Sequence, residues 1–455
     1  MNSRFSTIGR KPTRRGMLAI SMALAGLSWA TQREASGQTL TWDASGAATS
    51  SATATDGSGN WNTLTNSNWF TGTAPDSVWV NGDSAVFGNN NGAAGTVTIN
   101  DASGSVSVGT ITFNPASSGG YTIAAAAGDS LNLSAANSNP LITVSSGVSA
   151  TIAAPIGGSF NSYSSGSSQS GLIINGLGTL TLTGNSNYSG STIIENDGTS
   201  GTGTTVDLNG GTIGNTGSNF YVGLSSSGGE TDESTLTLNN NATLNASDLV
   251  VSFNFGESTE STTLGSSVIV AGNATMNVNE IQIDAGRNSS NTKGGEGSIV
   301  LDSGATLTLN GTGGAGSAVS LLDIANYSYE TGGGTGTAIS GEVNFAPGTV
   351  NGTIGTVNVG TGKAGTPGSD AADGSTATFT FGNGSLNIGT LNIARLGSEA
   401  IVGTVTMAAN TTGTLTVGSL NFGATGNGAS NAASIGVLNI SGGTLDMTGT
   451  MSIGG

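Results

Sequence analysis

Ala274-Thr275-Met276-Asn277-Val278 is one copy of a short strand phrase that returns through the second half of the chain. The other clear copies share its order of small residue, hydroxyl residue and apolar residue: Ala242-Thr243-Leu244, Ala305-Thr306-Leu307, Gly384-Ser385-Leu386, Gly413-Thr414-Leu415 and Gly443-Thr444-Leu445. Weaker copies lie at Gly211-Thr212-Ile213 and Gly348-Thr349-Val350. The central residues, at positions 212, 243, 275, 306, 349, 385, 414 and 444, are 29 to 43 residues apart. A period near 30 with strand chemistry indicates a stacked β-solenoid, in which each coil buries its inner side against its neighbours.

The composition leaves two rivals to this interpretation. Gly accounts for 77 of the 455 residues and Pro for only 7, yet no strict three-residue glycine period appears, which excludes collagen. Disorder is the stronger rival, because charged residues make up only 8% of the chain. Alternating runs such as 234–238 and 306–309 argue against disorder, since a random tail would not keep a two-residue period. We therefore predict an all-β, right-handed parallel β-helix with an aromatic-rich N-terminal cap.

The first 37 residues are typical of a signal peptide. Basic residues precede the uncharged stretch 16–30, which is shorter than the ~20 residues of a membrane span. Thr13-Arg14-Arg15-Gly16-Met17-Leu18 is similar to the twin-arginine export motif. Cleavage is expected after Ala35-Ser36-Gly37 or after Ser28-Trp29-Ala30. The sequence predicts export across the inner membrane, to the cell surface, the extracellular space or the periplasm.

The mature chain is strongly acidic. Six of the 10 Lys and Arg residues precede residue 38, and one of the 27 acids, Glu34, also falls in that segment, so residues 38–455 carry 4 − 26 = −22 charges. Such a surface repels nucleic acid and anionic lipid, and we expect no nucleic-acid partner and no membrane insertion. The chain has no Cys, so no disulfide contributes to its stability.

We divide the mature chain into three regions. Residues 38–100 hold four of the five tryptophans, Trp42, Trp61, Trp69 and Trp79, and are predicted to cap the first coil. The alternative is a platform on which sugars stack. Residues 101–200 are expected to form irregular solenoid coils with one clear repeat at 171–199. Residues 201–455 are expected to form a regular array of repeats of about 30 residues that stops within a repeat, and whether the array is truncated stays open.

The segment 171–194 is the most recognisable of the chain. Gly178-Thr179-Leu180-Thr181-Leu182-Thr183-Gly184-Asn185-Ser186-Asn187-Tyr188-Ser189-Gly190 resembles the autotransporter-associated β-strand repeat, in which a Gly-Thr-Leu strand leads through Gly-x-Asn-x-Tyr-x-Gly into a second strand. Ile174 stands where the family often has Lys, and no Leu closes the repeat near residue 199. The resemblance implies a passenger-type β-helix on a bacterial surface or secreted protein.

A typical coil is expected to hold three short strands, such as 267–270, 274–278 and 281–283. Insertions at 286–297, 360–375 and 424–434 follow the third strand and should therefore emerge along one side.

The residues that carry chemistry are few. Without His and Cys, no triad nucleophile and no His or thiolate metal site can form. Glu230, Asp232 and Glu233, with Asp248 further on, are a weak candidate for calcium. Asp284, Asp302 and Asp323 are candidates for paired-carboxylate chemistry, with Arg287 close to Asp284. We assign no catalytic, cofactor-binding or metal-binding residue and no cofactor.

The sequence thus favours an exported structural or adhesive surface protein without catalytic activity. Its expected partners are extracellular polysaccharide, other cell-surface components, or further copies of itself. The alternative is a polysaccharide-degrading β-helix enzyme with paired carboxylates. A cleft lined by acids and aromatics would favour the enzyme, and scattered acids would favour the scaffold.

Overall fold

The protein forms a parallel β-solenoid. The computed structural model describes residues 37–46, 53–73, 75–134, 139–162, 171–195, 203–225, 233–254, 264–283, 295–326, 339–361, 375–395, 401–423 and 434–454. Within these residues the regular structure is strand, and Ser36–Gly455 make one compact unit. The prediction of an all-β parallel β-helix is confirmed.

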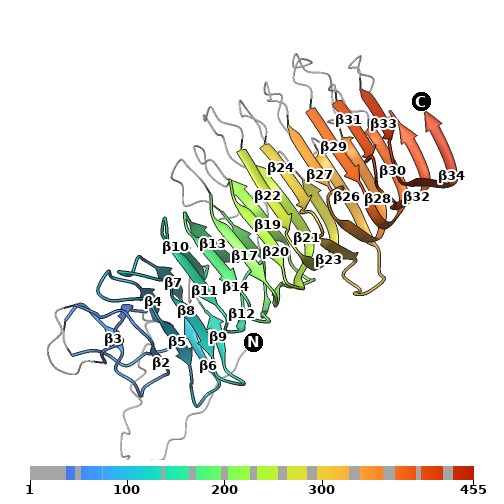
Figure 1. The fold of residues 1–455 in the computed structure, drawn as a ribbon. Helices are drawn as coiled ribbons and strands as arrows, with labels where there is room; N and C mark the ends of the chain where they lie inside the picture. Colours follow the sequence, from blue (N-terminus) through green and yellow to red (C-terminus); the bar gives the residue numbers. More distant parts are fainter. Residues whose placement is uncertain are drawn as a thin grey trace, which may run out of the picture. The chain divides into compact units, whose positions relative to one another are not determined.

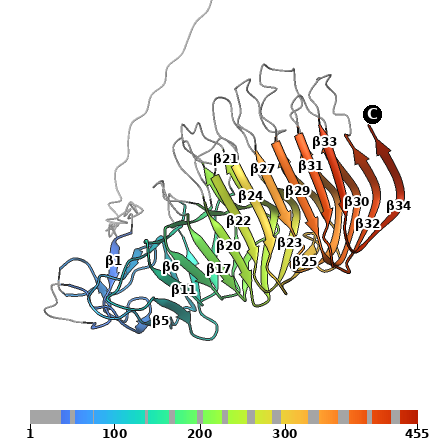
Figure 2. The same ribbon diagram turned by 45° about the horizontal axis from the view of Figure 1, so that its top comes forward.

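The coils share three faces, which we call A, B and C. Face B contains one strand of every coil: β2 (Gly59–Trp61), β5 (Thr96–Ile99), β8 (Thr122–Ala125), β11 (Ser149–Ile152), β14 (Thr179–Leu182), β17 (Thr205–Asn209), β20 (Thr235–Asn239), β22 (Leu264–Val270), β24 (Gly295–Leu301), β27 (Ser340–Asn344), β29 (Ser375–Phe381), β31 (Ile401–Met407) and β33 (Ile435–Ile440). Figures 1 and 2 show these strands side by side in chain order.

Faces A and C supply the remaining strands of each coil. Face A begins with β1 (Thr39–Trp42), β4 (Ser84–Phe87), β7 (Thr110–Phe113), β10 (Leu141–Val144), β13 (Leu172–Gly176), β16 (Thr192–Ile194) and β19 (Phe220–Ser225), and includes β26 (Val319–Asn326). Face C contains β6 (Ser105–Val108), β9 (Ser130–Leu133), β12 (Ile156–Ser159), β15 (Asn187–Ser189), β18 (Thr212–Gly214) and β25 (Thr306–Asn310). Described pairs are parallel except for β3 (Trp69–Phe70), which runs antiparallel to β1.

In later coils one strand passes from face C to face A without a break. These long strands are β21 (Ala242–Asn254), β23 (Asn273–Ile283), β28 (Thr349–Thr361), β30 (Asn383–Arg395), β32 (Thr414–Phe422) and β34 (Thr444–Ile453). The prediction of three separate strands per coil is therefore wrong for these coils. In β23 the side chains alternate between buried and half-buried until Asn279 and Glu280, which are both half-buried. This slip in the alternation turns the chain at the corner while the backbone ladder continues.

Strand alternation builds the core. In β14, Leu180 and Leu182 are buried and Thr179 and Thr181 are half-buried, as the two-residue period predicts. Apolar residues stack in register between coils, for example Leu180 beside Val206.

The repeated phrase sets this register with two exceptions. Thr212, Thr243 and Thr275 are paired in succession, but Thr308 rather than Thr306 lies opposite Thr275. Asn351 rather than Thr349 lies opposite Ser385 in the same way. Each slip is two residues, so every side chain keeps its face.

The N-terminal cap is an aromatic cluster. Trp42, Trp61, Trp69 and Trp79 are each 0–1% exposed, and the ring centroids of Trp69 and Trp79 are 4.5 Å apart. Phe87 stacks on Phe113 of the next coil at 5.6 Å and so continues the cluster into the solenoid. The predicted cap is confirmed, and buried rings leave no sugar-stacking platform on these tryptophans.

The predicted insertions have a common place in the order of the described strands. From residue 196 onward, each internal stretch outside the described residues follows a strand of face A and precedes a strand of face B in the sequence. This arrangement confirms the common phase of the three predicted insertions, most of whose residues are themselves outside the description.

A column of left-handed residues ends the strands of face A, where faces A and B meet. Non-glycine members are Ser252, Ala325 and Ala394, with φ of 59°, 53° and 56°, and glycine members include Gly360, with φ of 83°. Ala325 and Ala394 lie one on each side of Gly360 in the ladder. The positive φ changes the direction of the chain at the end of each strand, as a β-bulge also does.

Candidate functional site

A shallow groove crosses the outer side of face B. It has a volume of about 310 Å³ and spans β22, β24, β27 and β29. Its lining holds two carboxylates, Glu296 and Glu342, and the hydroxyls of Ser267, Ser298, Ser340, Thr376 and Thr378. We call these residues the face-B groove.

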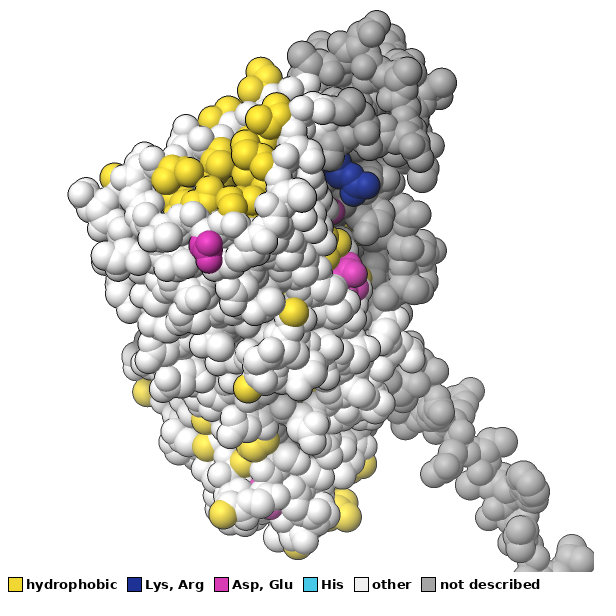
Figure 3. All heavy atoms as spheres, turned by 90° about the vertical axis from the view of Figure 1, so that its right-hand side faces the viewer, with side chains coloured by type: hydrophobic (Ala, Val, Ile, Leu, Met, Phe, Trp, Pro, Cys, Tyr) yellow, Lys and Arg dark blue, Asp and Glu magenta, His cyan; other side chains and the backbone are white. Residues whose placement is uncertain are grey.

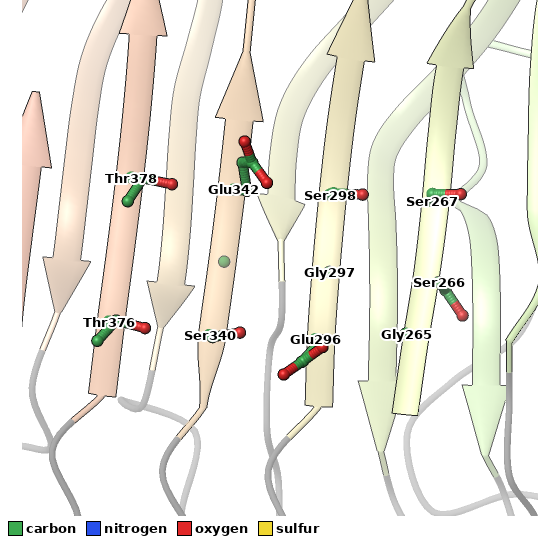
Figure 4. Close-up of a pocket in the computed structure, with 11 residues that line it drawn as sticks. Gly265, Ser266, Ser267, Glu296, Gly297, Ser298, Ser340, Glu342, Thr376 and Thr378 are labelled. Atoms are coloured by element: carbon green, nitrogen blue, oxygen red, sulfur yellow. The ribbon is translucent and has the colours of Figure 1, made fainter. Parts of the chain in front are cut away.

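The register of the strands sets the geometry of the groove. Ser267, Ser298, Glu342 and Thr378 form one row, because each pairs with the next across the sheet. Glu296 pairs with Ser340, which is two residues before Glu342 on β27. Figure 4 shows the two glutamates on neighbouring strands at these different heights. Strand spacing of about 4.8 Å and a two-residue rise of about 6.6 Å place their Cα atoms roughly 8 Å apart on the diagonal.

This arrangement has the polar groups for binding sugar hydroxyls. Hydroxyls donate and accept, and carboxylates accept strongly. Both glutamates are exposed, and the groove lining includes no aromatic side chain. A cleft that excludes water, in which one carboxyl group would be held protonated, is not formed by these described residues.

Neither glutamate was predicted from the sequence. The available signal was their place in the repeat, since Gly297-Ser298-Ile299 and Gly341-Glu342-Val343 occupy the same position of successive coils. That equivalence depends on the strand register, which an insertion of variable length between the coils conceals.

The acids that the sequence singled out are not brought together. Asp302 lies in an exposed turn after β24, where its carbonyl accepts a hydrogen bond from the Ala305 amide. Asp323 lies on face A, is 4% exposed, and accepts a hydrogen bond from the Thr361 hydroxyl at 3.1 Å. Asp284 and Arg287 lie outside the described residues. Asp302 and Asp323, two of the three candidates for paired-carboxylate chemistry, therefore lie at different places in the coil.

The candidate calcium residues are only partly described. Glu230 and Asp232 lie outside the described residues, Glu233 is exposed before β20, and Asp248 is in β21 beside Glu280. Burial raises the pKa of the Asp248 carboxyl above its ordinary value, and hydrogen bonds from Ser247 and Asn219 offset only part of this rise. Among the described residues, no group of three or more acids could hold a metal ion.

Asp323 borders a ladder of amides on the outer side of face A. In register, Asp323 is followed by Asn358, Asn392 and Asn421. The Nδ2 of Asn421 donates to Oδ1 of Asn392 at 2.9 Å, and Nδ2 of Asn392 donates to Oδ1 of Asn358 at 2.8 Å. The ladder is a stacking device, because each amide bonds the next coil.

The repeat-like segment forms one coil. Its tyrosine, Tyr188, is 3% exposed, shares a hydrogen bond with the Thr192 hydroxyl at 2.6 Å, and accepts one from the Gly214 amide at 3.2 Å. Burial raises the pKa of Tyr188 to about 12. Gly190 has φ of 103°, and a Cβ there would lie 2.6 Å from the Phe160 carbonyl oxygen. The spacing of Tyr and Gly in the phrase thus serves packing.

The last described coil leaves apolar side chains exposed. Ile435, Ile440, Met451 and Ile453 are 53–73% exposed in β33 and β34. Figure 3, which faces this end, shows hydrophobic side chains gathered in one patch. Contiguous apolar patches of this kind mark contact surfaces, and the predicted self-association stays a prediction.

Comparison with known proteins gives no relative: no family model, no curated protein and no solved structure matches the chain. Among the described residues, no helix is long and apolar enough to span a membrane.

Proposed function

We propose that the chain is an exported β-solenoid that acts as a structural or adhesive protein outside the inner membrane and has no catalytic activity. Two sequence features support export and a surface role: the signal-like segment 1–37 and the passenger-type repeat that 171–194 resembles. The parallel stack supports a scaffold, because it presents the same three faces over many coils.

The face-B groove is the observation that carries the adhesive part of the proposal. Its hydroxyls and two carboxylates lie on a rigid sheet and match the donors and acceptors of a polysaccharide chain. A shallow groove with exposed acids suits many weak contacts along an extended polymer better than it suits one tightly held small molecule.

Co-sedimentation of the full chain with insoluble bacterial and plant polysaccharides tests this function. We expect retention on at least one polymer and a marked loss with Glu296→Ala combined with Glu342→Ala. Asp302→Ala, at an exposed turn outside the groove, is the matched control and should bind as the parent does. No retention on any polymer, or equal loss in both variants, would contradict adhesion through this groove.

Export has its own test. Arg14→Lys with Arg15→Lys keeps the charge of the segment but changes the pair that resembles the twin-arginine motif. We expect the precursor of this variant to stay inside the inner membrane in cell fractionation. Normal export of the variant would contradict a twin-arginine route.

A second candidate is the polysaccharide-degrading enzyme, favoured by one observation: Glu296 and Glu342 share a groove. Glycoside hydrolysis requires two carboxyl groups about 5–9.5 Å apart, and the Cα atoms of these two glutamates lie roughly 8 Å apart. The exposure of both glutamates argues against this candidate, because two solvated carboxyl groups lack the different environments that would keep one protonated as the general acid and the other ionised as the base.

A further inference from the structure

The strands of face B carry acidic side chains and no basic ones. Their three carboxylates are Asp207 in β17, Glu296 in β24 and Glu342 in β27, and the 13 strands of this sheet contain no Lys or Arg. Asp207 and Glu342 lie between buried neighbours, and Glu296 pairs with Ser340, two residues before Glu342. Since side chains alternate along a strand, all three carboxylates lie on the outer side, which therefore carries charge of one sign.

The two glutamates of the face-B groove have no compensating charge. Both are exposed, and neither has an ion-pair partner among the described residues. Within the part of the chain that the structure describes, the only Lys or Arg is Arg395, which ends β30 on face A. A ligand that covers the groove must therefore bring positive charge of its own, or else leave two carboxylates without water and without a partner.

A row of hydroxyls extends the groove across the neighbouring strands. Thr235 of β20 pairs with Ser267, and the two hydroxyl oxygens share a hydrogen bond at 3.3 Å. Ser267 pairs with Ser298, and Ser298 pairs with Glu342, as Figure 4 shows for these last three residues. At about 4.8 Å per strand, the row from Thr235 to Glu342 is about 14 Å long and crosses the strands. A ligand that follows this row is an extended chain of repeating units.

Two aliphatic side chains border the same row. Ile269 of β22 and Val300 of β24 are half-buried on the outer side and pair with each other in register. They lie two residues beyond Ser267 and Ser298, a distance of about 6.6 Å along each strand. Sugar rings present apolar C–H faces as well as hydroxyls, so a sugar chain uses both the row and its border. A simple polyamine would use the carboxylates alone.

We propose that the face-B groove binds a polysaccharide of amino sugars whose amino groups are free and therefore positively charged. This inference rests on the proposed adhesive function and names its class of ligand. Ammonium groups donate charge-assisted hydrogen bonds to Glu296 and Glu342, and sugar hydroxyls bond to the serine and threonine hydroxyls. Each exposed ion pair is weak, so attachment depends on many repeats of the same contact along the polymer. Acidic polysaccharides are repelled by the same carboxylates.

Retention on chitosan and on chitin tests the class of ligand, because the two polymers share a backbone and differ in free against acetylated amino groups. The purified full chain is applied to both in weakly acidic buffer of low salt. We expect retention on chitosan, release by added salt, and no comparable retention on chitin. Glu296→Gln with Glu342→Gln should bind soluble glucosamine oligomers about tenfold more weakly, the loss expected for two exposed ion pairs.

The overall acidity of the chain requires a control of equal charge. Asp302→Asn with Asp446→Asn also removes two carboxylates, and both residues are exposed and lie outside the groove. We expect this variant to bind chitosan and glucosamine oligomers as the parent does. Circular dichroism with thermal unfolding checks that each variant folds.

Four results would overturn the inference: equal retention on chitin and chitosan, equal loss in the groove variant and the charge-matched control, release of the bound chain by a chelator of divalent cations, or polylysine binding that falls by the same factor in the groove variant. Equal retention on both polymers that is lost in the groove variant leaves adhesion through the groove intact. Failure to bind any polysaccharide overturns the proposed adhesion together with its class of ligand.

Discussion

Gly341 lies against the backbone of Ala325 where faces A and B meet: a Cβ atom on Gly341 would come within 2.8 Å of the Ala325 nitrogen and of Ile324 Cγ2. Ala325 belongs to the left-handed column, with φ of 53°, so its backbone is already fixed by the corner. The same close approach recurs at Gly403, where an added Cβ atom would lie 2.7 Å from the Ala394 nitrogen. Close backbone contact, rather than turn flexibility, explains these glycines.

Gly341→Val tests this contact. The added side chain must displace backbone, which typically costs about 1–3 kcal/mol for overpacking. We expect the variant to lower the free energy of unfolding by that amount in chemical denaturation. Ser340→Val, on the adjacent outward position of β27, should leave stability nearly unchanged, and an equal effect in both would contradict the account.

Asn392→Ala tests the amide ladder. The change removes the acceptor of Asn421 Nδ2 and the donor to Asn358 Oδ1 in a nearly buried site, so a cost of about 1–3 kcal/mol is expected. Asn387→Ala, exposed on the same strand, is the control. If both variants unfold at the same denaturant concentration as the parent, the ladder contributes nothing to stability.

Trp61→Ala tests the cap. Trp61 is fully buried between Trp69 and Trp79, and truncation of a buried aromatic costs about 3–5 kcal/mol. We expect that loss in thermal unfolding, and blue-shifted tryptophan emission in the parent that does not respond to added polysaccharide. Leu64→Ala, at a residue 73% exposed in the same region, should be neutral. A shift in tryptophan emission on addition of polysaccharide would instead indicate that these tryptophans form a platform on which sugars stack.

Asp101 makes stability depend on pH in the acid range. Burial raises its pKa, but hydrogen bonds from Ser103 and Thr63 outweigh burial and lower the pKa to about 2. Because the folded pKa lies below the unfolded value of about 3.9, the stabilisation is present above pH 4 and is lost as pH falls towards 2. We expect Asp101→Asn to be destabilised at pH 6 and to match the parent near pH 2. A constant difference at all pH values would contradict this assignment.

Much of the fold could be predicted from local patterns. Leu180 and Leu182 alternate with Thr179 and Thr181, and that period alone assigns the inner and outer sides of face B. Four tryptophans in one short region predicted an aromatic cap, because rings of that size at the end of a solenoid cover its first coil. Both inferences rest on neighbours in sequence.

What the sequence did not predict depends on contacts between coils. The merging of two strands into β23 follows from the phase slip at Asn279 and Glu280, where the alternation of side chains is interrupted but the backbone ladder to the neighbouring coils continues. Glu296 and Glu342 are 46 residues apart in sequence (342 − 296) and meet only because β24 and β27 are neighbours.

Release of reducing ends from polysaccharides by the purified full chain tests most directly the central proposal, namely that the solenoid is an exported scaffold without catalytic activity. The account predicts that polymers retained by the parent chain show no release above a heat-denatured control, in the parent and in Glu296→Gln alike. Steady release by the parent that is abolished in folded Glu296→Gln or Glu342→Gln would contradict it and assign the face-B groove to glycoside hydrolysis.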